Sequence, residues 1–165
     1  MVTQNCINTY STYSSTTGEI KPNQPAYGAT LTNNALNITG DGTAYTVAGF
    51  TEWYDIGSDF ASATGIYTAP VDCMFYFSGN FYGNGGLTAA HTKTEIKVVT
   101  SNRTYVNNSF SWQFYEKSGF GSYFWTVIAD MDAADTATYT YTVYNGTKTV
   151  DLFAARTYVQ GIFIC

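Results

Sequence analysis

The alternation of apolar and polar residues is most sustained between Gly65 and Gly83. Odd positions of this segment carry mostly apolar side chains, and even positions carry mostly polar or amphipathic ones. A period of two is typical of a β-strand with one buried face. Pro70 lacks a backbone N–H donor, so we expect it to divide the run into a short strand and a long central strand over residues 71–82.

The same period of two recurs along the rest of the chain. It predicts strands over residues 27–31, 36–39, 43–47, 51–56, 93–100, 110–114, 137–143 and 147–153, and the continuous apolar runs 123–129 and 158–165 predict two more. Asp41-Gly42 and Asn145-Gly146 separate alternating segments, and such dipeptides predict a β-hairpin at each position. No ten-residue stretch shows a helical period with caps. About ten short strands without a helix predict an all-β protein, an antiparallel two-sheet sandwich or barrel.

The chain divides into a polar beginning and one domain. Residues 1–24 are rich in Ser, Thr and Asn and contain no apolar face, so we interpret them as a non-globular N-terminal arm. Such an arm is expected to become ordered by docking onto a partner. Residues 25–165 form the predicted domain, since a chain of 165 residues can bury roughly 70% of its unfolded surface in a single core.

Composition and charge exclude several classes of function. Charged residues make up 12% and aromatic residues 18% of the chain, a mixture that suits strands and turns. The net charge of -5 argues against a nucleic-acid partner, because phosphate binding needs a concentrated basic surface. The first residues have neither a basic start nor an apolar run, and no stretch approaches the roughly 20 apolar residues of a membrane helix. We therefore expect a soluble chain without a secretion signal or membrane insertion.

The aromatic content exceeds what one small core holds and indicates an exposed patch. Met74, Tyr76 and Tyr82 occupy the outer face of the central strand. The strands that contain Tyr123 and Ile162 are apolar on both faces, which suits cover on both sides, within the domain or by a partner chain. Exposed apolar patches mark interfaces, so these five residues are the candidate interface.

The candidates for catalysis are few. The three cysteines, Cys6, Cys73 and Cys165, form neither a CxxC motif nor a disulfide framework, and Cys73 is expected to fill the core from the inner face of the central strand. His91 is the single histidine, in a small polar loop, where we expect it to be solvated. No nucleophile elbow accompanies it. We predict that the protein is not an enzyme and needs no cofactor.

An acidic loop is the weak candidate for a metal site. Asp130, Asp132 and Asp135 could supply oxygen ligands to calcium, but the loop lacks the Gly and the terminal Glu of an EF-hand. A capped turn, in which Asp135 accepts backbone hydrogen bonds, is the favoured interpretation. Asp55 and Asp59 leave the same two alternatives.

Several segments resemble the C1q/TNF-like jelly-roll family. The run Gly65-Ile-Tyr-Thr-Ala-Pro-Val-Asp-Cys-Met-Phe-Tyr-Phe77 is similar to its central motif, with further similarity at residues 54–60 and 158–164. Residues 37–47 and 130–136 resemble the version found in phage and other viral structural proteins. The chain departs from the pattern at Cys73 and Ala134, where glycine is common.

The resemblance implies a homotrimer packed around a three-fold axis by side chains of the central strands, and some members of the family bind calcium. It also implies a structural protein at the surface of a phage or virus particle, either a capsid decoration or cement protein or a fibre or spike head that binds a host receptor. No repetitive shaft is encoded, which favours decoration. The arm, residues 1–24, would dock on other virion proteins. The alternative is a secreted C1q-like module that binds a glycan or protein, for which exposed aromatics such as Tyr115, Phe120 and Tyr144 are candidate contacts.

Overall fold

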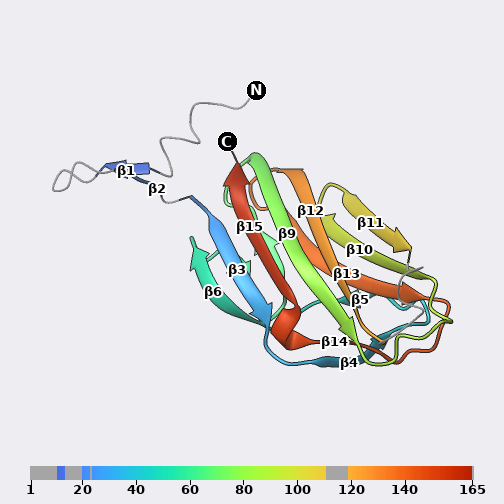
Figure 1. The fold of residues 1–165 in the computed structure, drawn as a ribbon. Coiled ribbons are helices and arrows are strands. Elements are labelled where there is room, and N and C mark those ends of the chain that lie inside the picture. Colours follow the sequence, from blue (N-terminus) through green and yellow to red (C-terminus); the bar gives the residue numbers. More distant parts are fainter. Residues whose placement is uncertain (1–10, 14–19, 23, 111–118, 165) are drawn as a thin grey trace.

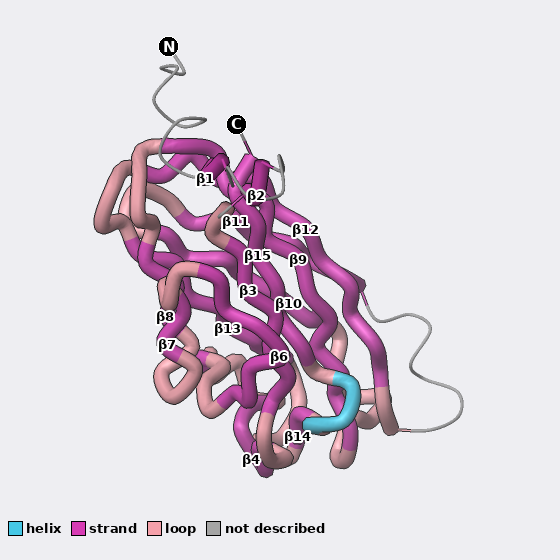
Figure 2. Tube along the Cα trace, turned by 90° about the vertical axis from the view of Figure 1, so that its left-hand side faces the viewer, coloured by secondary structure: helices cyan, strands magenta, loops and turns pink. Residues whose placement is uncertain are grey.

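The computed structural model describes residues 11–13, 20–22, 24–110 and 119–164. These residues form a seven-stranded and a six-stranded sheet, both antiparallel, and one separate two-stranded pair (Figure 1). The prediction of an all-β, two-sheet antiparallel sandwich is confirmed. Among the described residues the only helical segment is one 3-10 turn, Ala154–Arg156, which lies at the end of the sandwich near β14 (Figure 2).

The seven-stranded sheet is organised around β9. Its strands are β3 (Ala26–Leu31), β4 (Ala35–Thr39), β6 (Phe50–Ile56), β9 (Cys73–Asn84), β12 (Gly121–Met131), β14 (Val150–Leu152) and β15 (Tyr158–Ile164). β9 pairs with β12 along one edge and with β15 along the other. The predicted central strand is therefore confirmed, and the C-terminal strand lies inside the sheet between β9 and β3 as predicted.

The six-stranded sheet covers the inner face of the first. Its strands are β5 (Tyr45–Thr46), β7 (Phe60–Ala61), β8 (Ile66–Thr68), β10 (Lys93–Thr100), β11 (Thr104–Phe110) and β13 (Thr136–Tyr144). Pro70 separates β8 from β9, as expected, and these two strands belong to different sheets. The predicted strand over residues 110–114 lies outside the described residues beyond Phe110.

Both predicted hairpins are wrong. β4 pairs with β14 and β5 pairs with β13, so the chain crosses from one sheet to the other at Asp41-Gly42 and again after Asn145-Gly146. The physical reason is that the two turns bond to each other's segments instead of closing their own. The N–H of Gly42 donates to the carbonyl of Val143, and the N–H of Gly146 donates to that of Gly40, each at 2.9 Å.

Much of the aromatic content lies between the two sheets. Phe75, Phe77 and Phe81 of β9 point inward, as the alternation predicts, and pack against buried tyrosines of the opposite sheet. Tyr27 and Tyr139 share a hydrogen bond between their hydroxyl groups across the core. Burial raises the pKa of Tyr139, so its hydroxyl stays neutral at physiological pH. A core of this kind accepts phenol groups because they can pair with one another.

The arm contains a strand pair that its composition did not predict. β1 (Ser11–Tyr13) and β2 (Ile20–Pro22) pair antiparallel with each other, and neither pairs with a described strand of the two sheets (Figure 1). An isolated two-stranded pair is marginally stable at best. The arm therefore contributes no described strand to the sandwich.

Candidate functional site

The outer face of the seven-stranded sheet carries a row of exposed apolar side chains. The strand register aligns the five residues of this apolar row across β12, β9, β15, β3 and β6: Ile128, Tyr76, Ile162, Ala26 and Ile56. Ile128, Ile162 and Ile56 are 54%, 46% and 41% exposed. Cross-strand neighbours on one face lie about 5 Å apart, so the row is continuous.

Two further exposed side chains extend this surface. Met74 precedes Tyr76 on the same face of β9, and Phe124, 71% exposed, lies on the same face of β12 as Ile128. Asp130 is the only charged side chain at the outward positions of β12, β9, β15 and β3, all within the described residues. We call the apolar row together with Met74 and Phe124 the outer apolar face.

A polar strip beside the row is satisfied within the chain. Gln160 donates to the hydroxyl of Ser78 at 2.9 Å, and Ser122 donates to the side-chain carbonyl of Asn80 at 2.8 Å. The side-chain amide of Asn80 donates to the backbone carbonyl of Arg156 at 2.7 Å. The polar groups on this face therefore need few hydrogen bonds from outside, whereas the apolar row lacks cover.

Of the five predicted interface residues, three lie on the outer apolar face, one is covered by its own chain and one lies in the core. Met74, Tyr76 and Ile162 lie on the outer apolar face as expected. Tyr82 also points outward, but Phe120 stacks on its ring at 5.7 Å between centroids, and the guanidinium group of Arg156 lies 4.9 Å from it. Tyr82 is consequently buried by its own chain.

The placement of Tyr123 on the outer face was wrong. Its side chain is buried in the core, accepts a hydrogen bond from Thr94 at 3.0 Å and packs against Tyr141. The sequence held a signal for the correct assignment. Asp130 is charged and must face outward. Phe124 and Ile128 lie an even number of positions away from it along this strand and face outward too, so Tyr123 points inward.

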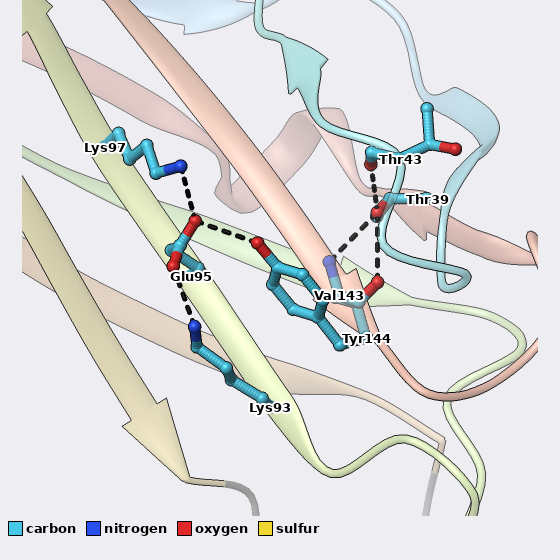
Figure 3. A network of polar contacts seen from close by, with 7 residues as sticks. All are labelled: Thr39, Thr43, Lys93, Glu95, Lys97, Val143 and Tyr144. Atoms are coloured by element: carbon cyan, nitrogen blue, oxygen red, sulfur yellow. Dashed lines mark hydrogen bonds and ion pairs between the residues drawn. The ribbon is translucent and has the colours of Figure 1, made fainter.

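A buried carboxylate marks the outer face of the six-stranded sheet (Figure 3). Glu95 accepts hydrogen bonds from Lys93 at 2.8 Å, from Lys97 at 2.7 Å and from the Tyr144 hydroxyl at 2.9 Å. Burial alone would raise the pKa of Glu95, but the three donors outweigh it and lower the pKa to about 2. This carboxylate stays ionised and fully bonded, so the arrangement is structural and unsuited to a general acid.

His91 is buried, which contradicts the expectation of a solvated loop residue. Its Nδ1 accepts the backbone N–H of Thr88 at 3.0 Å, and its Nε2 lies 3.2 Å from the carbonyl of Thr147. A Cβ added to Gly146 would lie 2.2 Å from Nε2. Glycine at this position allows the ring to fill the space between the loops, a packing role that the sequence did not reveal.

The acidic loop forms the capped turn that was the favoured interpretation. Asp135 accepts the backbone N–H of Asp132 at 2.9 Å and the side-chain amide of Asn102. Asp55 likewise accepts the N–H groups of Asp59 and Phe60 at 3.3 and 3.1 Å. Burial, followed by the charge of Asp55, raises the pKa of Asp59.

Two negative observations apply to the described part of the chain. No three His, Cys, Asp or Glu side chains gather there in an arrangement that could hold a metal ion. Likewise, none of the helical structure described is of the length and hydrophobicity that a membrane-spanning helix requires.

Comparison with known proteins identifies the fold. No protein-family model and no curated protein sequence matches the chain. Among solved structures, the globular domain of the zebrafish complement 1qA protein is 15% identical with a TM-score of 0.58, covering 86% of this chain and 98% of that one. Murine APRIL is 8% identical with a TM-score of 0.57 over 86% and 99% of the two chains. Eiger TNF from S. frugiperda is 9% identical with a TM-score of 0.59 over 86% and 93%.

The protein has a C1q/TNF-like jelly-roll fold. At these identities the similarity concerns the fold alone. The three structures come from animals, so they support the C1q/TNF-like part of the resemblance and add nothing to its viral part.

Proposed function

We propose that this protein is a non-enzymatic binding and assembly module that forms a homotrimer through the outer apolar face. The apolar row is the observation that carries the proposal. Fully burying an aliphatic side chain contributes about 1.5–3 kcal/mol, so each half-exposed isoleucine of the row would add on the order of 1 kcal/mol when a second copy covers it. Five aligned strands that present such residues form a surface suited to another protein.

The character of this face favours a second copy of the chain over a charged partner. Asp130 is the only charged residue of β12, β9, β15 and β3, whereas the edge strand β6 also carries Glu52 and Asp55. The polar strip is already hydrogen-bonded. In a cyclic trimer each copy meets the next through two different patches of its surface, and charges of like sign must not meet across that contact. A nearly uncharged, internally satisfied face meets this condition.

The trimer is testable by light scattering on the purified chain. We expect three times the chain mass of 18.1 kDa at micromolar concentration. Ile128→Lys should give monomers with unchanged β-sheet circular dichroism, because it places a charge in the apolar row. Val106→Lys is the matched control, since Val106 is 50% exposed on β11 of the other sheet. A stable wild-type monomer would contradict the proposal.

At the finer level, we propose a structural role at the surface of a phage or virus particle, as a decoration or cement protein attached through residues 1–24. The sequence resemblance to viral structural proteins supports this role. A fibre or spike head that binds a host glycan or protein is the competing version. Mass spectrometry of purified particles would test both, since each requires the chain in the virion.

A secreted C1q-like binding module is the second candidate function. The similarity to the zebrafish complement 1qA globular domain over 86% of this chain favours it. It predicts binding on a glycan array by the isolated protein, together with absence of the chain from purified particles. Detection of the chain in particles at stoichiometric amounts would reject it.

A further inference from the structure

The chain contains two described Asn-Gly dipeptides, Asn84-Gly85 at the end of β9 and Asn145-Gly146 directly after β13. In such a pair the backbone nitrogen of glycine can attack the side-chain carboxamide, and glycine has no Cβ to obstruct the approach. From the sequence alone, the two pairs are expected to react at the same rate. Exposure alone ranks Asn145 first, since it is exposed while Asn84 is half-buried.

At Asn84 the two reacting groups already touch. The N–H of Gly85 donates to the side-chain carbonyl oxygen of Asn84 at 2.9 Å. This hydrogen bond holds the nitrogen beside the carboxamide whose carbon it would attack, and such proximity favours an intramolecular reaction. Because both residues are partly exposed, water and hydroxide can reach them.

At Asn145 both groups are held elsewhere. The N–H of Gly146 donates to the carbonyl of Gly40 at 2.9 Å. The side-chain amide of Asn145 donates to the hydroxyl of Thr92. The nitrogen of Gly146 and the carboxamide of Asn145 are therefore directed away from each other by their contacts with other segments.

We propose that Asn84 is a site of spontaneous deamidation and that the fold protects Asn145. Hydroxide removes the N–H proton of Gly85, and the nitrogen bonds to Cγ of Asn84 to close a five-membered succinimide. The bond from Cγ to Nδ2 breaks, and ammonia leaves with a proton from water. A water molecule then opens the ring at either carbonyl, which gives aspartate or an isoaspartyl linkage. Nothing is oxidised or reduced.

The product has a structural consequence at the edge of the seven-stranded sheet. Asn84 and Asp151 are direct partners in the ladder between β9 and β14. Asp151 also accepts the backbone N–H of Asn37 at 2.6 Å, which ties β4 to the same place. A second carboxylate at position 84 faces this one, and like charges directly opposite in a ladder are destabilising.

Timed peptide mapping tests the proposal. The full-length protein is held in mildly alkaline buffer, and aspartate and isoaspartate at positions 84 and 145 are quantified by mass spectrometry. In the folded protein Asn84 should react at least about tenfold faster than Asn145, a difference of about 1.4 kcal/mol in barrier. In denaturant the two rates should converge. Equal rates in the folded protein, or protection of both residues, would overturn the assignment.

The charge consequence has its own test. Asn84→Asp reproduces the aspartate product and should lower the thermal unfolding midpoint. Adding Asp151→Asn should restore the midpoint, since it removes one charge of the pair and keeps the acceptor for Asn37. An Asn84→Asp variant as stable as the wild type would reject the proposed repulsion.

Discussion

At the scale of single residues, Ala134 shows how a departure from a sequence pattern becomes a physical cost. Its φ of +71° lies in the left-handed region, which disfavours residues with a Cβ by roughly 1–2 kcal/mol. The resemblance marked this position as one where glycine is common, and glycine adopts this backbone without a steric penalty. The capped turn, in which the N–H of Ala134 donates to the carbonyl of Ala69 at 2.7 Å, holds the strained residue in place.

Ala134→Gly should therefore stabilise the protein. We expect the free energy of unfolding to rise by up to about 1 kcal/mol, the relief of backbone strain minus the greater entropy of glycine in the unfolded chain. Denaturant unfolding measures the change. Ala129→Gly is the control, because Ala129 is a buried strand residue without positive φ and should lose stability instead. A loss in both variants would contradict the strain argument.

Glu95 predicts a pH dependence of stability. Its pKa is lowered in the folded protein from 4.5 to about 2, so its contribution is complete above pH 4.5 and is lost as the pH falls toward 2. Glu95→Gln should reduce the free energy of unfolding at neutral pH by on the order of 1 kcal/mol, since Gln cannot replace both lysine pairings. Denaturant titrations across this acid range should show a shallower pH dependence for the variant. The same pH dependence of the free energy of unfolding in both proteins would contradict the stabilising role of the ionised Glu95.

At the scale of elements, alternation located the strands but did not determine their partners. The predicted strand over residues 93–100 matches β10, and the long central strand is β9 displaced by two residues. Pairing failed at Asp41-Gly42 and Asn145-Gly146, because a turn dipeptide reports a change of direction and not the sheet that receives the next strand. The contacts that hold these two turns, including the packing of the His91 ring against Gly146, join segments far apart in sequence. Neighbouring residues in the sequence therefore do not predict them.

The stability of the turns at Asp41-Gly42 and Asn145-Gly146 should depend on how closely the His91 ring fits against Gly146. Gly146→Ala places a methyl group 2.2 Å from the His91 ring, closer than real contacts allow, so we expect a loss of about 2–3 kcal/mol in stability. The same substitution in a His91→Ala background should cost less than about 1 kcal/mol, because the obstructing ring is gone. Urea unfolding of all four proteins completes the cycle. Equal costs in both backgrounds would mean that His91 is not the obstacle.

At the scale of the whole molecule, the outer apolar face was only partly accessible from the sequence. Parity placed Met74 and Tyr76 outward, and the doubly apolar strand containing Ile162 was correctly assigned an exposed side. The same reasoning failed for Tyr123, because a strand that is apolar on both faces does not reveal which set of residues points inward. Cover of Tyr82 by Phe120 comes from a distant segment and could not be predicted.

The arm gives the test of attachment at this scale. Deleting residues 2–22 removes β1 and β2, which pair with no described strand of the sandwich, so assembly of the domain should be unchanged. Under the proposed virion role the truncated protein should no longer associate with particles, measured by co-sedimentation. Incorporation at normal occupancy would show that attachment uses the domain itself.

The first and the last described strands of the sandwich, β3 and β15, are neighbours. Ala26, the first residue of β3, is the ladder partner of Ile162, near the end of β15 (Figure 1). Entry and exit of the polypeptide are thus side by side, at one end of the sheet. A short linker between them would permit circular permutation, and the domain could be grafted into a surface loop of a carrier protein without spreading the two flanking segments of the carrier.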